Sequence, residues 1–306
     1  MQMLSFRRCV VRVVVGAAVV TSASLGTGAV AGAAPQSSCG QARQDVAIRS
    51  SVPLLDWSEN FGIDAQGDLW VSRVMRGEVQ RYDRDGRLTA TVAVPSPGAV
   101  RLGPDGLLYV VTGNSPLAGS GGIVRFDPAA ARPNPVAFAI GFPQPNGAAF
   151  DADGNLYVTT GNGLHRLRPD GSEDMDWWSA VSIDGPNGVA VSGDSVYVTA
   201  NFVGSAGPVG RVLRLSRSNP GEPSTVADLT SFGTLPDFVD DLVVRDGVLY
   251  VTTLAGHLVR VNPSTGTACT VVSTQPLTAV VADPADPSAL LAGSEEGTVL
   301  RIRPIG

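Results

Sequence analysis

The sequence predicts an all-β protein, a six-bladed β-propeller with four antiparallel strands in each blade. A phrase recurs along the chain: a small apolar strand, a turn with glycine, then a strand that carries an aromatic residue. The aromatic residues of successive copies stand 39 to 53 residues apart, and a four-stranded repeat of roughly this length is typical of propeller blades. Beyond residue 33, no stretch sustains the 3.6-residue apolar period of an amphipathic helix.

The six copies follow one another in chain order. The phrase spans 62–71, 100–110, 148–158, 189–198 and 242–251, with a degenerate sixth copy at 279–292. A third strand follows each copy, at 79–83, 123–127, 164–168, 212–215, 258–261 and 299–302, and a variable fourth strand leads to the next unit. Trp177 and Trp178 fall on the expected fourth strand of blade three. Because the last unit ends after its third strand, we expect residues 46–49 to supply its outer strand and close the ring.

The composition agrees with one large β domain over residues 34–306. Hydrophobic residues make up 43% of the chain and supply a core, while 36 glycines and 22 prolines supply many turns. The run Asp151 to Asn155 resembles the start of an EF-hand loop. However, Leu156 stands where that loop needs glycine and no glutamate closes it, so we interpret the run as a hairpin turn.

Residues 1–33 have the layout of a signal peptide that is removed on export. Arg7, Arg8 and Arg12 precede an apolar run at 13–20, and small residues suited to cleavage follow at 29–33. We therefore expect a secreted or cell-envelope protein. Export by the Sec route is favoured, and the paired arginines leave the twin-arginine route open. The apolar run is too short for a stable membrane span.

The charge pattern limits the partners of the protein. All 22 basic residues are arginines, interspersed with 28 acidic residues, and the formal net charge is −6. Nucleic acid binding is not expected, because it requires a basic face. A small-molecule substrate or a cation remains compatible with this surface, and the sequence does not give the oligomeric state.

The two cysteines outside the leader, Cys39 and Cys269, predict one disulfide in an exported protein. Cys39 would enter the outer edge of blade six and Cys269 begins the outer strand of blade five, so they would lie next to each other. Two unpaired, buried thiols are the alternative.

Residues just before the innermost strand of each blade converge at the mouth of a propeller's central channel. In this chain they are Glu59, Pro97, Asn146, Asn187, Asp240 and Thr278. Four of the six offer carboxylate or amide oxygens, the ligands that Ca²⁺ prefers, and none is the histidine or cysteine expected for Zn²⁺.

These motifs, Ser58-Glu59-Asn60, Pro145-Asn146-Gly147, Pro186-Asn187-Gly188 and Val239-Asp240-Asp241, resemble those of the senescence marker protein/gluconolactonase/luciferin-regenerating family. They are also similar to those of diisopropylfluorophosphatase and the paraoxonases. The resemblance implies a six-bladed propeller with one catalytic Ca²⁺ in the channel. By this resemblance Glu59, Asn146, Asn187 and Asp240 are metal ligands and Asp240 is the base or nucleophile. Asp241 falls where paraoxonases have a further ligand.

The function that follows is calcium-dependent hydrolysis of a small lactone, ester or phosphotriester. Asn114, Asn162, Asn201, Phe202 and Phe238 lie in loops expected near the mouth and are candidates for the substrate pocket. Specificity is expected from the loops 113–122 and 201–210. His165 and His257 are expected on the surface or rim, with His257 as a candidate proton shuttle. The alternative is a secreted, non-catalytic propeller with NHL-like Pro-x-Gly turns that binds a protein or a glycan.

Overall fold

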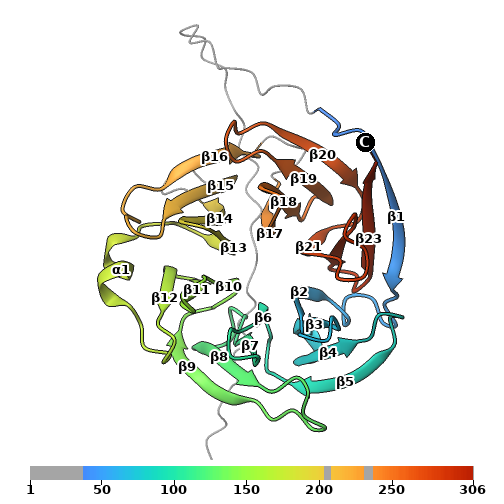
Figure 1. Ribbon diagram of the computed structural model, residues 1–306, viewed down its shortest axis with the longest axis horizontal. Helices are drawn as coiled ribbons and strands as arrows, with labels where there is room; N and C mark the ends of the chain where they lie inside the picture. Colours follow the sequence, from blue (N-terminus) through green and yellow to red (C-terminus); the bar gives the residue numbers. More distant parts are fainter. Residues whose placement is uncertain (1–36, 203–207, 231–236, 306) are drawn as a thin grey trace, which may run out of the picture. The chain divides into compact units, whose positions relative to one another are not determined.

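The computed structural model describes residues 37–202, 208–230 and 237–305, and the predicted leader and part of the loop 201–210 lie outside this range. In the described part, the strands form six sheets arranged around a centre (Figure 1). Blade one consists of β2 (Ser58–Ile63), β3 (Leu69–Arg73), β4 (Glu78–Tyr82) and β5 (Leu88–Ala93), and blade two of β6 (Val100–Leu102), β7 (Leu108–Thr112), β8 (Gly121–Phe126) and β9 (Val136–Phe142). Blade three has β10 (Ala148–Phe150), β11 (Leu156–Thr160) and β12 (Gly163–Leu167).

The second half of the ring repeats this order. Blade four consists of β13 (Pro186–Ser192), β14 (Ser195–Phe202), β15 (Pro208–Ser216) and β16 (Ser224–Asp228), and blade five of β17 (Val239–Arg245), β18 (Val248–Thr253), β19 (His257–Val261) and β20 (Ala268–Ser273). Blade six has β21 (Leu277–Ala282), β22 (Leu290–Ser294) and β23 (Val299–Ile305), completed by β1 (Gln41–Ile48). The predicted six-bladed propeller is confirmed.

The N-terminal strand closes the ring, as predicted. Strand β1 pairs antiparallel with β23 on the outer edge of blade six, with Val46 opposite Leu300 (Figure 1). The predicted disulfide is present: Cys39, just before β1, is bonded to Cys269 of β20, with a Cα–Cα distance of 5.2 Å. The start of the chain is therefore attached both to its last blade and to the blade before it.

Apolar packing between blades holds the ring together. Each of the six buried apolar clusters combines side chains from two neighbouring blades, including one cluster between blades six and one. For example, the buried Trp70 of blade one packs against Phe126 of blade two, with ring centroids 5.3 Å apart. The second strands, such as β3 and β11, are buried along their whole length, whereas the outer strands β5 and β9 are largely exposed.

Blade three departs from the prediction. It has three strands, and the segment expected as its fourth strand forms a short helix, α1 (Met175–Ala180). The assignment of Trp177 and Trp178 to a strand is therefore wrong. Asp174 caps the helix by accepting a hydrogen bond from the Trp177 amide, and the segment has no β-branched residue to favour a strand. Trp177 packs edge-on against Tyr157 of its own blade, and the buried cluster that contains it extends to Val189 of blade four. A separate 3₁₀ turn, η1 (Val74–Arg76), lies between β3 and β4 of blade one.

The run that resembles an EF-hand is a hairpin turn, as interpreted. Asp151 Oδ1 accepts hydrogen bonds from the backbone amides of Asp153 and Asn155, and Gly154 takes a left-handed conformation with φ of 84°. Within the described residues, no helix is long and apolar enough to cross a membrane.

Candidate functional site

The candidate ligands lie where the innermost strands are irregular. In β2, β13, β17 and β21 the pairing with the second strand of the blade shifts by one residue near the mouth. These shifts enclose Glu59, Asn187, Asp240 and Thr278 respectively. A β-bulge of this kind changes the direction of a side chain that would otherwise face a neighbouring blade. The bulge thus directs Glu59, Asn187 and Asp240 toward the mouth, whereas the hydroxyl of Thr278 donates to the Ser58 carbonyl in blade one.

Buried hydroxyl groups on the second strands hold the irregular segments. Thr159 Oγ1 accepts a hydrogen bond from the Gly147 amide at 2.7 Å and donates to the carbonyl of Asn187 in the next blade. Thr199 Oγ1 accepts from the Gly188 amide and donates to the carbonyl of Asp240, both at 2.6 Å. Each threonine therefore connects its own blade to the candidate ligand of the next one.

This role was missed in the sequence, although a signal exists. The hydroxyl residue stands two positions after the anchoring aromatic residue in four of the blades, as Ser72, Thr159, Thr199 and Thr252. All four side chains belong to residues with no exposed surface. Blade two has Val111 at this position, and it is also a blade whose mouth position, Pro97, offers no side-chain oxygen.

A chain of hydrogen bonds connects the candidate ligands at the mouth. Asn114 Nδ2 donates to Glu59 Oε1 at 2.8 Å and lies 3.3 Å from Asn146 Oδ1. Asn146 Nδ2 donates to Asn187 Oδ1 at 2.8 Å, and the side chain of Asn187 lies close enough to Asp240 to lower the pKa of its carboxyl group. Four predicted ligands from blades one, three, four and five therefore meet, and Asn114 supplies the contribution of blade two from a loop.

The two acids of this group are buried and close enough to repel each other. Burial raises the pKa of Asp240 well above its ordinary value, and the negative charge of Glu59 raises it further. Burial also raises the pKa of Glu59, although hydrogen bonds from Asn114 and from Trp57 Nε1, at 2.7 Å, oppose this. A cation between the two carboxylates would offset both the burial and the repulsion.

Asp241 lies close enough to this group for its charge to raise the pKa of Glu59 and of Asp240, but its own contacts are different. Its carboxylate accepts a hydrogen bond from the Val280 amide at 3.2 Å and lies 3.7 Å from Arg101 Nη2. Arg101 is itself fixed by donating from Nη1 to Asn60 Oδ1 at 2.6 Å and to the Phe61 carbonyl at 2.7 Å. Asp241 is therefore paired with Arg101, whereas the carboxylate of Asp240 belongs to the group of candidate ligands.

The mouth contains a polar cavity and an apolar cavity that share residues 114–116. The polar cavity, about 440 Å³, is bordered by Asn114, Asn146, Asn187 and Asn201, from blades two to four. The apolar cavity, about 300 Å³, is bordered by Glu59, Trp57, Val74 and Met75 of blade one. A small molecule that reaches the candidate ligands would therefore meet amide groups on one side and apolar side chains on the other.

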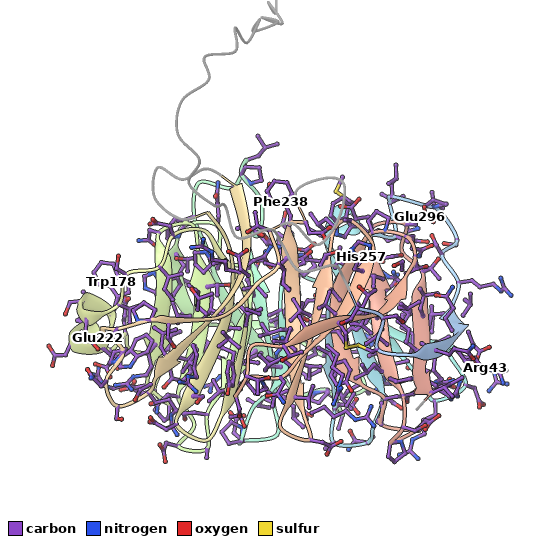
Figure 2. The ribbon with its side chains drawn as sticks, turned by 90° about the horizontal axis from the view of Figure 1, so that it is seen from above. Arg43, Trp178, Glu222, Phe238, His257 and Glu296 are labelled. Carbon is purple, nitrogen blue, oxygen red and sulfur yellow. A yellow bond between two sulfur atoms is a disulfide. The ribbon has the colours of Figure 1, made fainter. Side chains whose placement is uncertain are left out.

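The predicted pocket residues separate into different places. Asn114 and Asn201 line the polar cavity, and Asn201 also exchanges two hydrogen bonds of 2.9 Å with the backbone of Val239. Phe238 and His257 lie at the upper rim in Figure 2, and neither lines the two mouth cavities. His257 Nδ1 is 3.3 Å from Asp237 Oδ2. The side chain of Phe202 and residues 203–207 lie outside what the structure describes.

Asn162 and His165 differ from expectation. Asn162 faces a separate cavity on the side of blade three, not the mouth. His165, expected on the surface or rim, is 4% exposed and borders the same side cavity. Neighbouring side chains engage both of its ring nitrogens, which compensates for the burial of these polar atoms.

Calcium fits the donor set at the mouth. Within the described residues, no three or more His, Cys, Asp or Glu side chains lie together as a metal site. A metal here therefore depends on the amide oxygens of Asn146 and Asn187 in addition to the carboxylates of Glu59 and Asp240. A set made only of oxygens with two negative charges matches Ca²⁺ and does not match Zn²⁺.

The comparisons with known proteins concern the fold. No protein-family model matches the sequence, and no curated protein matches it either. Among solved structures, a putative oxidoreductase (glucose dehydrogenase) from Thermus thermophilus has a TM-score of 0.65 at 17% identity, covering 85% of this chain and 99% of that one. A gluconolactonase from Xanthomonas campestris has a TM-score of 0.62 at 18% identity, covering 88% and 98%. These likenesses establish the fold.

A third similar structure is regucalcin, a calcium-binding protein from Agrobacterium tumefaciens, with a TM-score of 0.60 at 17% identity over 83% of this chain and 93% of that one. The propellers that the motifs resemble are thus among the structural neighbours, as the sequence predicted. The similarity to diisopropylfluorophosphatase and the paraoxonases stays a prediction. Because the neighbours also include an oxidoreductase, the fold by itself does not select the chemistry.

Proposed function

We propose that this protein is an exported, calcium-dependent hydrolase of a small lactone or a related ester, including phosphotriesters. The observation that carries the proposal is the meeting of Glu59, Asn146, Asn187 and Asp240 at the channel mouth, connected by hydrogen bonds and bordered by two cavities. The names of two structural neighbours, a gluconolactonase and a calcium-binding regucalcin, agree with it. Export agrees with the disulfide, since such bonds persist in oxidising compartments.

The residues of the chain have distinct roles in this proposal. When bound, Ca²⁺ would polarise the carbonyl or phosphoryl oxygen of the substrate and stabilise the negative charge that develops there. Asn146 and Asn187 would hold the ion with their side-chain oxygens. The side-chain amide of Asn146 fixes the side-chain oxygen of Asn187 by donating a hydrogen bond to it. Asp240 accepts the proton of the attacking water on its carboxylate. The apolar cavity beside Trp57 and Met75 holds the acyl or alkyl part of the substrate.

Replacement of Asp240 with asparagine tests the proposal. The side chain keeps its size and an oxygen but loses the charge and the ability to accept a proton, so turnover should fall by about 10²–10⁴-fold. The assay is hydrolysis of a panel of lactones, aryl esters and phosphotriesters with calcium and with a chelator. The control is Asp246→Asn, which removes a carboxylate that is 89% exposed.

A second measurement separates a metal site from a catalytic site. Chelation should lower the melting temperature of the wild type, and Asp240→Asn should weaken this effect. If the wild type shows no calcium-dependent hydrolysis of any substrate in the panel, the hydrolase proposal is refuted, and a propeller that binds a protein or a glycan becomes the better interpretation.

A further inference from the structure

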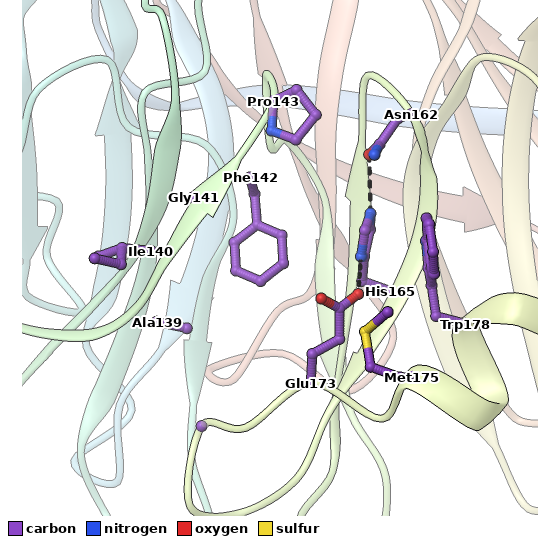
Figure 3. A pocket seen from close by; sticks show the side chains of 11 residues that line it. Ala139, Ile140, Gly141, Phe142, Pro143, Asn162, His165, Glu173, Met175 and Trp178 are labelled. Atoms are coloured by element: carbon purple, nitrogen blue, oxygen red, sulfur yellow. Dashed lines mark hydrogen bonds and ion pairs between the residues drawn. The ribbon is translucent and has the colours of Figure 1, made fainter.

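A cavity of about 460 Å³ lies on the side of the ring, between the outer strand of blade two and the helix of blade three (Figure 3). Its lining comes from β9, β12, α1 and the turn before α1. Figure 2 shows one of the lining residues, Trp178, on the side of the ring and away from the upper rim that carries Phe238 and His257. The cavity is therefore separate from the mouth, and the proposed hydrolysis does not use it.

A buried histidine organises this cavity. His165 is 4% exposed, its Nδ1 pairs with Glu173 Oε1, and its Nε2 lies 2.9 Å from Asn162 Oδ1. The ring of Trp178 stacks on the imidazole, with centroids 5.4 Å apart and planes 20° apart, and Phe142 meets it edge-on at 5.2 Å. Because hydrogen-bonding partners at both nitrogens and two aromatic rings hold the imidazole in place, the carboxylate of Glu173 that pairs with it has a fixed position.

The second oxygen of Glu173 is available to a ligand. The Glu173 side chain is 27% exposed, and Figure 3 shows one oxygen bonded to His165 and the other on the side of Phe142. None of the described lining residues is an arginine. The neighbouring Arg168 is engaged elsewhere, since it donates to the Glu173 backbone carbonyl and to Asp174, both at 2.9 Å.

Apolar side chains border this carboxylate. Phe142 lines the cavity although it is only 6% exposed, whereas Ile140 is 79% exposed and Met175 54% exposed at the edge of the cavity. A carboxylate next to an aromatic ring suits a positively charged nitrogen, which binds to the charge and to the face of the ring. Exposed aliphatic side chains suit an apolar group attached to that nitrogen.

We infer that the cavity on the side of blade three is a binding site for a small organic cation, an alkyl- or arylammonium compound. Glu173 provides the negative charge, Phe142 the aromatic surface, and Ile140 and Met175 the apolar contact. The volume of about 460 Å³ is within the range of ordinary ligand pockets. His165 is a positioning residue that holds Glu173.

The test is titration calorimetry with benzylammonium, using benzyl alcohol as the uncharged analogue and glucose as a polar neutral probe. We expect the wild type to bind the cation at least about tenfold more tightly than either neutral compound, because a charge-assisted hydrogen bond to a carboxylate is stronger than a hydrogen bond from a neutral hydroxyl. Glu173→Gln keeps an acceptor for His165 and removes the charge, so it should abolish this preference. Glu222→Gln, an equal change on an exposed acid outside the cavity, should leave it intact.

A second variant keeps the inference testable if Glu173→Gln does not fold. Ile140→Arg introduces a guanidinium at an exposed position on the edge of the cavity and should also prevent binding of the cation, while its melting temperature stays near that of the wild type. Absence of cation binding in the wild type, equal or tighter binding of a neutral probe, or unchanged binding in Glu173→Gln would each overturn the inference. Hydrolysis at the mouth should be unaffected in both variants.

Discussion

Replacement of Thr199 with valine should loosen the connection between blades four and five at Asp240. The Thr199 hydroxyl is completely buried and makes two hydrogen bonds of 2.6 Å, from the Gly188 amide and to the Asp240 carbonyl. Valine has nearly the same shape, so no cavity forms, but both backbone groups lose their partner. Each unsatisfied buried group costs about 1–3 kcal/mol, so the loss of two partners should lower the free energy of unfolding by about 2–6 kcal/mol.

Chemical denaturation measures this effect, and Thr199→Ser is the matched control. Serine keeps the hydroxyl and loses only a methyl group, which should cost about 1 kcal/mol. A readout beyond stability follows from the position of Asp240: the valine variant should bind calcium more weakly than the serine variant. If the two variants unfold at the same denaturant concentration and bind calcium equally, the hydroxyl does not hold the candidate ligand and the reasoning is wrong.

Two further predictions concern the outer edge of the ring. Replacing both Cys39 and Cys269 with serine should lower the free energy of unfolding by up to about 5 kcal/mol in the chain-entropy model, since the bond joins residues 230 positions apart. Denaturation under non-reducing conditions measures this loss, and an unchanged midpoint would contradict the prediction. Hydrogen bonds from Ser288 and Arg303 hold the pKa of Asp286 at about 2, so Asp286→Asn should destabilise the protein at pH 7, and the difference should disappear as the pH falls from about 4 to about 2. A difference that does not change with pH would argue against this ion pair.

The fold could be predicted because each blade repeats the same local sequence pattern. An aromatic residue such as Trp70 or Tyr157 marks the second strand, and a turn with glycine precedes it, so the period alone gives the number of blades. Ring closure followed from a missing strand in the last repeat. Helix α1 could not be predicted in this way, because six residues are too few to show a helical period and the cap depends on how Asp174 lies in the folded chain.

The candidate site was predictable only in part. Topology gave the convergence of Glu59, Asn146, Asn187 and Asp240, since residues before the innermost strands of a propeller must meet. It did not decide the role of Asp241, because a one-residue bulge determines how two adjacent side chains are directed. The positions of loop residues could not be predicted from the topology: Asn162, expected near the mouth, lines the cavity on the side of blade three.

Blade two shows why the mouth is asymmetric. It has Val111 in place of the buried hydroxyl and Pro97 in place of a ligand, and Asn114 from its loop fills the gap between Glu59 and Asn146. The polar cavity consequently extends over blades two to four, where the neutral amides lie, while both carboxylates of the group come from blades one and five. A substrate that enters this cavity would approach from the uncharged side. The electron-rich oxygen of a lactone or ester could then reach the ligand group without first passing Glu59 or Asp240, which would repel it. This arrangement favours neutral or weakly charged substrates over dianions, and comparing lactones with their hydrolysed acids as inhibitors would measure that preference directly.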